Sequence, residues 1–208
     1  MNNKKILLEP AFVLHSRCYR ETSVLLTLFT QHEGRVDLVA KGVRQAKSKT
    51  SGLLQPFFPL LISFAGKTEL MTLTQVEPHG ALSMLQGHHL FAGFYLNELL
   101  IYFLQKHDPH PILFKHYQEA IKVLSKHGEI EPILRQFEKN LLAEIGYGIL
   151  PDASAAEKLF NTQDHYCFLK ETDWVRADSL PGCHQAATFI GEHLHNMANN
   201  FWPPRYFA

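Results

Sequence analysis

The chain has 208 residues, of which 46% are hydrophobic and 19% charged, and its 20 basic and 20 acidic residues give a formal net charge of zero. These values exclude a disordered chain and describe a globular protein of one or two domains. No apolar run is long enough to cross a bilayer, and the apolar run Ile6-Leu7-Leu8 is too short for a signal peptide. We therefore expect a cytoplasmic protein with no membrane association.

The first 80 residues carry the pattern of β-strands. Five segments are rich in residues that suit a pleated surface: 11–15, 22–30, 34–40, 56–64 and 69–77. Residues 65–68 have the composition of a turn. Five strands in a segment of this length predict a small barrel. The OB-fold is the commonest five-stranded barrel that holds nucleic acid, although an SH3-like barrel has the same strand count.

From about Leu82 the apolar residues follow a helical period. The first helix is apolar around most of its circumference, which predicts the buried centre of a bundle. Six apolar residues recur along it at spacings of mostly three or four and form a stripe: Phe91, Phe94, Tyr95, Leu99, Tyr102 and Phe103. A second helix starts at Asp108-Pro109 and ends before Gly128, and a third has Pro132 in its first turn and ends at 146–148. The short connections predict an antiparallel bundle.

Residues 149–181 lose the helical period and carry a small hairpin, with strands at 165–169 and 174–176. A last helix is expected over about 183–198. The predicted fold class is therefore α+β, an N-terminal five-stranded OB-fold barrel followed by an α-helical bundle domain with a small hairpin-like insertion. We expect the domains to be residues 1–80 and 81–208.

Basic charge is concentrated in one part of the barrel sequence. Residues 1–80 hold ten basic and six acidic residues, and residues 81–208 hold ten and fourteen. Segment 35–49 contains a single acidic residue, Asp37, and five basic residues: Arg35, Lys41, Arg44, Lys47 and Lys49. Arg17 and Arg20, expected in the connection between strands one and two, would add to the same field. A basic loop on such a barrel is typical of DNA binding through phosphates, but a solvated surface loop explains the charge equally well.

Metal and catalytic motifs are absent from the sequence. The densest groups of possible ligands are His107, His110 and His116 with Asp108, and His193 and His195 with Cys183 and His184. Neither group has the spacing of a metal site. Whether Cys167 meets Cys183 stays open, because this depends on the hairpin folding onto the last helix. No nucleophile elbow, phosphate-binding loop or dinucleotide fingerprint occurs, so we predict no metal, no cofactor and no enzyme activity.

An ordered set of motifs carries a family resemblance. In the barrel these are Ala11-Phe12-Val13-Leu14, Arg17, Arg20-Glu21-Thr22-Ser23, Phe29-Thr30, Gly34-Arg35-Val36, Val39-Ala40-Lys41-Gly42-Val43-Arg44, Ser48 and Leu54-Gln55-Pro56-Phe57. In the helical part they are Tyr95-Leu96-Asn97-Glu98-Leu99-Leu100, Leu134-Arg135-Gln136-Phe137-Glu138, Leu141-Leu142 and Gly146-Tyr147-Gly148. Over about residues 9–150 the chain resembles the RecO family of recombination mediators.

The resemblance implies a protein that binds single- and double-stranded DNA. From the charge pattern of the barrel we expect the phosphates to be neutralised by Arg17, Arg20, Arg35, Lys41, Arg44, Lys47 and Lys49. The resemblance also implies that the protein anneals complementary strands and works with RecR to load RecA onto DNA coated by single-strand-binding protein. Arg135 lies in the matching motif of the helical domain and suits the carboxylate of that protein's tail. The four-cysteine zinc insertion of some members has no counterpart here, which again predicts no structural zinc. The alternative is an adaptor whose helical domain binds single-strand-binding protein, with little DNA binding of its own.

Overall fold

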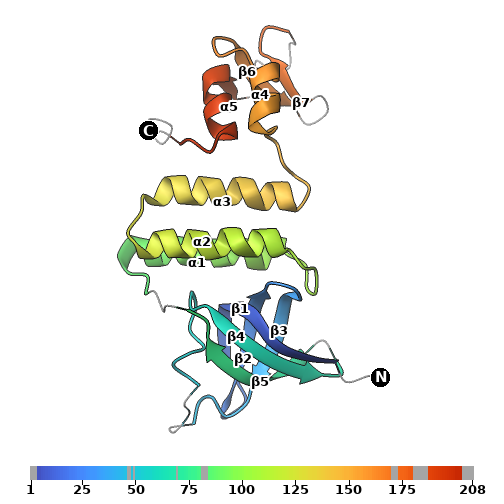
Figure 1. Cartoon of the computed structure of the whole chain (residues 1–208), viewed down its shortest axis with the longest axis vertical. Coiled ribbons are helices and arrows are strands. Elements are labelled where there is room, and N and C mark those ends of the chain that lie inside the picture. The colour runs from blue at the N-terminus through green and yellow to red at the C-terminus, as the bar shows by residue number, and fades with distance from the viewer. Residues whose placement is uncertain are drawn as a thin grey trace. The chain divides into compact units, whose positions relative to one another are not determined.

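The computed structural model describes residues 4–45, 48, 50–68, 70–80, 84–169, 173–179 and 187–202. The chain divides into two units, residues 1–137 and 138–208, and the boundary falls within the third helix. Figure 1 labels most of the elements of both units. Among the described residues, no helix is both long and apolar enough to span a membrane.

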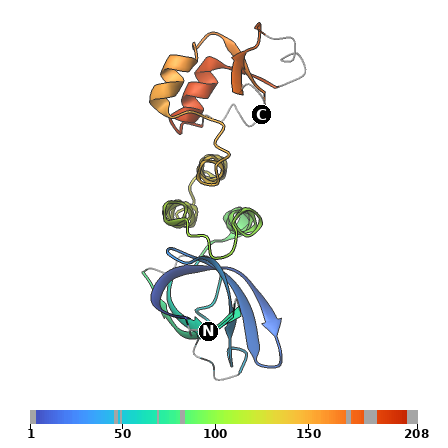
Figure 2. The ribbon, with the colours of Figure 1, turned by 90° about the vertical axis from the view of Figure 1, so that its right-hand side faces the viewer.

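The N-terminal part is a closed five-stranded barrel, as predicted. Its strands are β1 (Lys4–Tyr19), β2 (Ser23–Thr30), β3 (Gly34–Ala40), β4 (Leu60–Gly66) and β5 (Leu70–Pro78). They close in the order β1-β2-β3-β5-β4, with β3 and β5 parallel and the other pairs antiparallel. This is an OB-fold barrel, drawn in blue to green in Figure 2. Alternate residues of the strands fill its core, because side chains alternate between the two faces of a strand.

Strand β1 is much longer than the predicted segment 11–15. Its first half pairs with β4 and its second half with β2, so that one strand borders both neighbours in the closed barrel. The predicted limits of the fourth strand were also wrong, because β4 begins at Leu60 rather than at residue 56. Ala65 and Gly66, expected in a turn, instead pair with β1.

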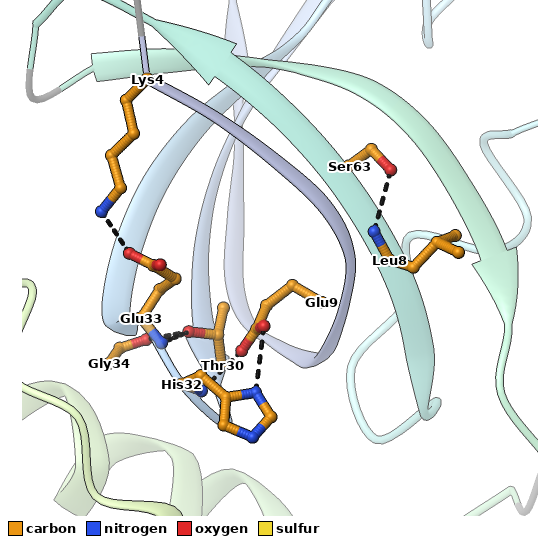
Figure 3. Close-up of polar contacts among 8 residues, drawn as sticks. All are labelled: Lys4, Leu8, Glu9, Thr30, His32, Glu33, Gly34 and Ser63. Carbon is orange, nitrogen blue, oxygen red and sulfur yellow. Dashed lines mark hydrogen bonds and ion pairs between the residues drawn. The ribbon is translucent and has the colours of Figure 1, made fainter.

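A bulge in β1 explains why its first half was missed. Leu7 and Leu8 lie opposite the single residue Ser63, and they are 61% and 52% exposed. Leu8 has a φ of 51°, and its backbone N–H donates to the Ser63 hydroxyl at 3.1 Å (Figure 3). The residue after the bulge, Glu9, is buried and accepts from the backbone N–H of His32 at 2.6 Å. Two exposed leucines beside a buried acid break the alternation on which strand prediction depends.

Two helices cover the outside of β1 and β2. They are α1 (Gly87–Phe103) and α2 (Pro111–Ser125), which contact each other and lie side by side in Figure 2. The rings of Phe114 and Tyr117 on α2 lie 5.1–6.2 Å, between centroids, from those of Phe12 on β1 and Phe29 on β2. These four aromatic residues are almost fully buried and join the helices to the barrel.

A buried polar chain fixes the position of these helices. The hydroxyl of Tyr117 donates to Asn97 Oδ1 at 2.5 Å, and Asn97 Nδ2 donates to the carbonyl of Leu14 in β1 at 2.9 Å. Burial raises the pKa of Tyr117, so that its hydroxyl stays a donor. One residue from each of α1, α2 and β1 is therefore held in a single hydrogen-bonded line.

The prediction that α1 is the buried centre of a bundle was wrong. Its buried face consists of Ala92, Gly93, Leu96, Asn97 and Leu100. The predicted stripe lies mostly on the opposite side, where Phe91 is 71% exposed, Phe94 45%, Tyr95 36%, Tyr102 82% and Phe103 41%. Helix α1 thus carries a broad exposed aromatic face.

The third helix, α3 (Ile130–Glu144), ends as the glycine motif predicts. Gly146 has a φ of 83°, its N–H donates to the carbonyl of Ala143, and the N–H of Tyr147 donates to the carbonyl of Leu142 at 2.7 Å. This is the Schellman arrangement, which satisfies carbonyls that the helix leaves free. In its first half, the Phe137 ring packs against Tyr117 at 6.2 Å.

The second unit combines the end of α3 with α4 (Ala153–Leu159), β6 (His165–Leu169), β7 (Asp173–Arg176), β8 (Thr188–Ile190) and α5 (Gly191–Ala198). The predicted hairpin is present as β6 and β7, within a sheet of order β7-β6-β8. Helix α4 was missed, and the predicted last helix was wrong in that residues 188–190 form a strand. Cys183 and His184 lie outside the described residues.

Candidate nucleic-acid interface

The wall of the barrel presents a row of residues outward across four strands. Arg17 pairs with Leu25, Leu25 with Val39, and Val39 with Thr72. Directly paired residues project to the same side of a sheet. The next residue along β2, Leu26, is completely buried in the core, so the row faces away from it. Arg17 therefore lies within β1 on the outer face, not in the connection where the sequence placed it.

An open groove of about 570 Å³ includes Val39 and Thr72 of this row and lies at the end where β1 turns into β2. We call it the outer groove, and it is lined by Tyr19, Arg20, Glu21, Thr22, Ser23, Val39, Lys41, Leu70 and Thr72. Val39 and Leu70 make its floor apolar, and Leu70 is 41% exposed. An apolar floor with an aromatic edge suits unstacked bases, and flanking cations suit phosphates.

The cations of this groove come from two strand ends. Arg20 lies in the turn after β1, in a left-handed backbone conformation with φ of 54°, and its guanidinium lies 5.2 Å from the centre of the Tyr19 ring. Lys41 follows the last residue of β3 and is exposed, as is Arg17. The acid Glu21 belongs to the same rim, so the excess of positive charge here is local and modest.

Arg44 joins the loop after β3 to the turn after β1. Its Nη1 donates to the carbonyls of Arg20 and Glu21, at 3.2 Å each, and its backbone N–H donates to the carbonyl of Thr22 at 3.0 Å. Within the part of the chain that the structure describes, Nε and Nη2 of Arg44 make no hydrogen bond. These two nitrogens form the fork that binds carboxylate or phosphate in a bidentate manner. The guanidinium is thus held in place by backbone carbonyls through Nη1, while Nε and Nη2 stay available for a ligand.

A second groove, of about 540 Å³, is lined in part by Arg44 and lies at the mouth of the barrel. We call it the mouth groove. It is lined by Ser16, Val24, Leu26, Val43, Arg44, Gln45, Ser51, Leu54 and Gln55. The sequence did not indicate it, because its walls come from β1, β2 and the loop between β3 and β4.

Arg35 has a different environment from the other predicted cations. Its Nε donates to the carbonyl of Leu104 at 3.0 Å, and its own carbonyl accepts from the N–H of His107 at 3.0 Å. Both partners belong to the segment between α1 and α2. Arg35 therefore ties β3 to that segment, at the opposite end of the strand from Lys41.

The acid of the basic segment is neutralised by a cation that the sequence did not suggest. Asp37 accepts from Thr27 at 2.8 Å and lies 2.7 Å from the Lys106 ammonium. Burial by itself raises the pKa of Asp37, but the hydrogen bonds from Lys106 and Thr27 and the charges of Lys106 and Arg35 outweigh it, so the pKa is lowered. Lys106 is remote in sequence, which is why the pattern within 35–49 could not reveal it.

The remaining candidates from the sequence are two lysines, Arg135 and the possible metal ligands. Lys47 and Lys49 lie outside the described residues. Arg135 lies in α3 and is partly buried. No group of three or more histidine, cysteine, aspartate or glutamate side chains that could hold a metal occurs among the described residues. Of the candidate histidines, His195 bonds the carbonyl of Phe160 at 2.7 Å through Nε2, and His110 lies 3.4 Å from Asp108.

Two family models match the chain in order, "Recombination protein O N terminal" over residues 4–82 and "Recombination protein O C terminal" over residues 84–175. The DNA repair protein RecO of Nitrosospira multiformis is 49% identical over 191 residues, which are 91% of this chain and 78% of that protein. The namesake of Coxiella burnetii is 41% identical over 192 residues, 92% and 82% of the two chains. That of Thiobacillus denitrificans is 42% identical over 184 residues, 84% and 72%. On these matches, the chain belongs to the RecO family of DNA repair proteins.

Proposed function

We propose that this protein is a non-catalytic mediator of recombinational repair that binds single- and double-stranded DNA on its barrel. The observation that carries the proposal is the braced Arg44 on an OB-fold barrel: it lines the mouth groove, and its Nη1 is held by the carbonyls of two residues that line the outer groove. Backbone carbonyls that pre-orient a guanidinium reduce the entropy lost when it binds a phosphate.

In this proposal Arg17, Arg20, Lys41 and Arg44 neutralise phosphates around the grooves, and Lys47 and Lys49 extend the same basic loop. Arg35 is left out, because its guanidinium already bonds the carbonyl of Leu104. Cations that screen one strand also lower the repulsion of a second strand. The same contacts would therefore favour annealing of complementary strands.

The wider role follows from the family. We propose that the protein acts with RecR to help load RecA onto DNA coated by single-strand-binding protein, in the cytoplasm and at the nucleoid when bound to DNA. Residues 1–80 would be the DNA-binding domain and residues 81–208 the helical domain. Arg135 would bind the terminal carboxylate of single-strand-binding protein, since a guanidinium fork matches carboxylate geometry.

A second candidate function is an adaptor that binds protein partners and little DNA. The exposed aromatic face of α1 favours it, because Phe91 and Tyr102 are 71% and 82% exposed. Contiguous apolar surface of this kind is typical of protein interaction sites. In this case the barrel would only present the helices.

Fluorescence anisotropy with labelled single-stranded DNA separates the two functions. We expect tight binding at low salt that weakens steeply as salt rises, and weaker, less salt-dependent binding when Arg44, Lys47 and Lys49 are replaced together by alanine. Affinity that changes with neither salt nor the triple substitution would refute the DNA-binding role. No DNA binding, with retained binding of a C-terminal peptide of single-strand-binding protein, would establish the adaptor.

A further inference from the structure

We propose that the mouth groove is a subsite for one unstacked nucleobase of single-stranded DNA. The proposal rests on the proposed function, since it takes DNA to be the ligand of the barrel. It adds a second site beside the outer groove, and Arg44 lines this second site.

The lining of the mouth groove has the composition of a base-binding pocket. Its walls are apolar, and its rim is formed by two amides and two hydroxyls. The apolar residues are Val24, Leu26, Val43 and Leu54, and the polar ones are Gln45, Gln55, Ser16 and Ser51. Proteins that take a base out of the stack hold it between apolar or aromatic side chains and bond its edge with polar groups. A volume of about 540 Å³ leaves room for a base with its sugar.

The two amides at the rim are available to a ligand. Within the described part of the chain the Gln45 side chain makes no hydrogen bond. Gln55 Nε2 reaches only the carbonyl of Ser51, at 3.4 Å, which is longer than an ordinary hydrogen bond. Both side chains are exposed. A primary amide has a donor and an acceptor, so it can pair with the edge of any base after rotation.

Arg44 supplies the phosphate contact that such a base requires. It lines the mouth groove, while its Nη1 is held by the carbonyls of Arg20 and Glu21 in the rim of the outer groove. Within the described part of the chain its Nε and Nη2 make no hydrogen bond, so they are available to a phosphate beside the mouth groove. A base in the mouth groove with its phosphate on this fork uses the charge and the apolar walls together, which neither an apolar peptide nor an isolated phosphate would do.

The subsite has a consequence for strand preference. Bases of a duplex are stacked and paired, so their edges and faces cannot enter the groove without unpairing. Contacts to phosphates serve single and double strands alike. The mouth groove therefore adds affinity for single strands only, and the cationic rim accounts for duplex binding.

The test compares three fluorescent ligands of equal length: a single strand, a single strand of abasic residues, and a duplex. The variant Gln45→Ala/Gln55→Ala removes the amides, and Gln75→Ala is the matched control, an exposed glutamine of β5 outside both grooves. We expect the double variant to lose about tenfold in affinity for the normal single strand, corresponding to two hydrogen bonds. Its affinity for the abasic strand and the duplex stays at the wild-type value, and the control changes none of the three.

A variant that fills the mouth groove tests the base subsite independently of the two amides. Ser16→Phe places a ring in the groove from an exposed position on β1, and we expect the same selective loss. Equal binding of normal and abasic strands by the wild type, or losses of the same size on all three ligands, would overturn the subsite while leaving the proposed function intact. Competition by a free deoxynucleoside monophosphate at micromolar concentration would also overturn it, because the ligand would then be a free nucleotide. Absence of salt-dependent binding to any DNA would instead refute the proposed function.

Discussion

The salt dependence of single-strand binding provides the most quantitative prediction. The described interface offers four cations, Arg17, Arg20, Lys41 and Arg44. Each phosphate neutralised on a single strand contributes about −0.7 to the slope of log affinity against log salt, so these four give about −2.8. Arg17→Gln/Lys41→Gln removes two of them and should make the slope shallower by about 1.4. Between about 50 and about 200 mM salt, the wild type then loses about sevenfold more affinity than the variant.

The assay is an anisotropy titration at several salt concentrations with one labelled strand. Lys115→Gln/Lys126→Gln is the matched control, because it makes the same change in net charge at exposed positions of α2 and its C-cap, away from the grooves. We expect the control to keep the wild-type slope. If both double variants change the slope equally, the binding reflects overall charge rather than the barrel, and the assignment of Arg17 and Lys41 is refuted.

Three further predictions concern the structure that holds this interface. Tyr117→Phe leaves Asn97 Oδ1 without its donor in a buried site and should lower the free energy of unfolding by about 1–3 kcal/mol, measured in urea. The lowered pKa of Asp37 means that its contribution to stability is complete above the ordinary value of 3.8 and is lost as pH falls below that value through the pKa of the folded state. The difference in urea midpoint between pH 6 and pH 3 should therefore be smaller in Asp37→Asn than in the wild type, and an equal difference would contradict the assignment. Gly34→Ala should destabilise the fold severely, because Gly34 has a φ of 70° and an added Cβ would lie 2.3 Å from the carbonyl oxygen of Asp108. A thermal midpoint within about a degree or two of the wild type would show that the backbone at Asp108 can move away from the added Cβ at little cost in stability, and would refute this prediction.

The barrel could be predicted from sequence because its central strands keep a clean pattern. The sequences of β2 and β3 are alternating or continuously apolar and are bounded by turn residues. Gly34 marks the start of β3. The first half of β1 has no such pattern, since its bulge exposes Leu7 and Leu8. Its place in the barrel depends on pairing with β4, more than fifty residues away, which local pattern does not reveal.

Helix α1 shows the limit of reading burial from composition. A helix that is apolar all around is normally buried, and this one was predicted so. The structure instead buries its small and aliphatic side, with Ala92 and Leu96, and leaves Phe91 and Tyr102 at the surface. Periodicity therefore located the helix but could not tell which apolar side the barrel covers.

The candidate site was predictable in charge but not in contacts. The excess of basic residues in 35–49 includes Lys41 and Arg44, which line the two grooves. Arg35 belongs to the same run and yet bonds a carbonyl beyond α1. The bracing of Arg44 by backbone carbonyls and the neutralisation of Asp37 by Lys106 require the fold, because hydrogen-bond partners distant in sequence leave no local signal.

The central claim is that DNA binds on the barrel at the two grooves beside Arg44. Amide hydrogen exchange of the intact protein, with and without saturating single-stranded DNA, tests this directly. We predict slower exchange in peptides covering the turn from Tyr19 to Ser23 and the loop from Lys41 to Gln55, with no change in α1. Protection confined to α1, with these two segments unchanged although DNA is bound, would contradict the account.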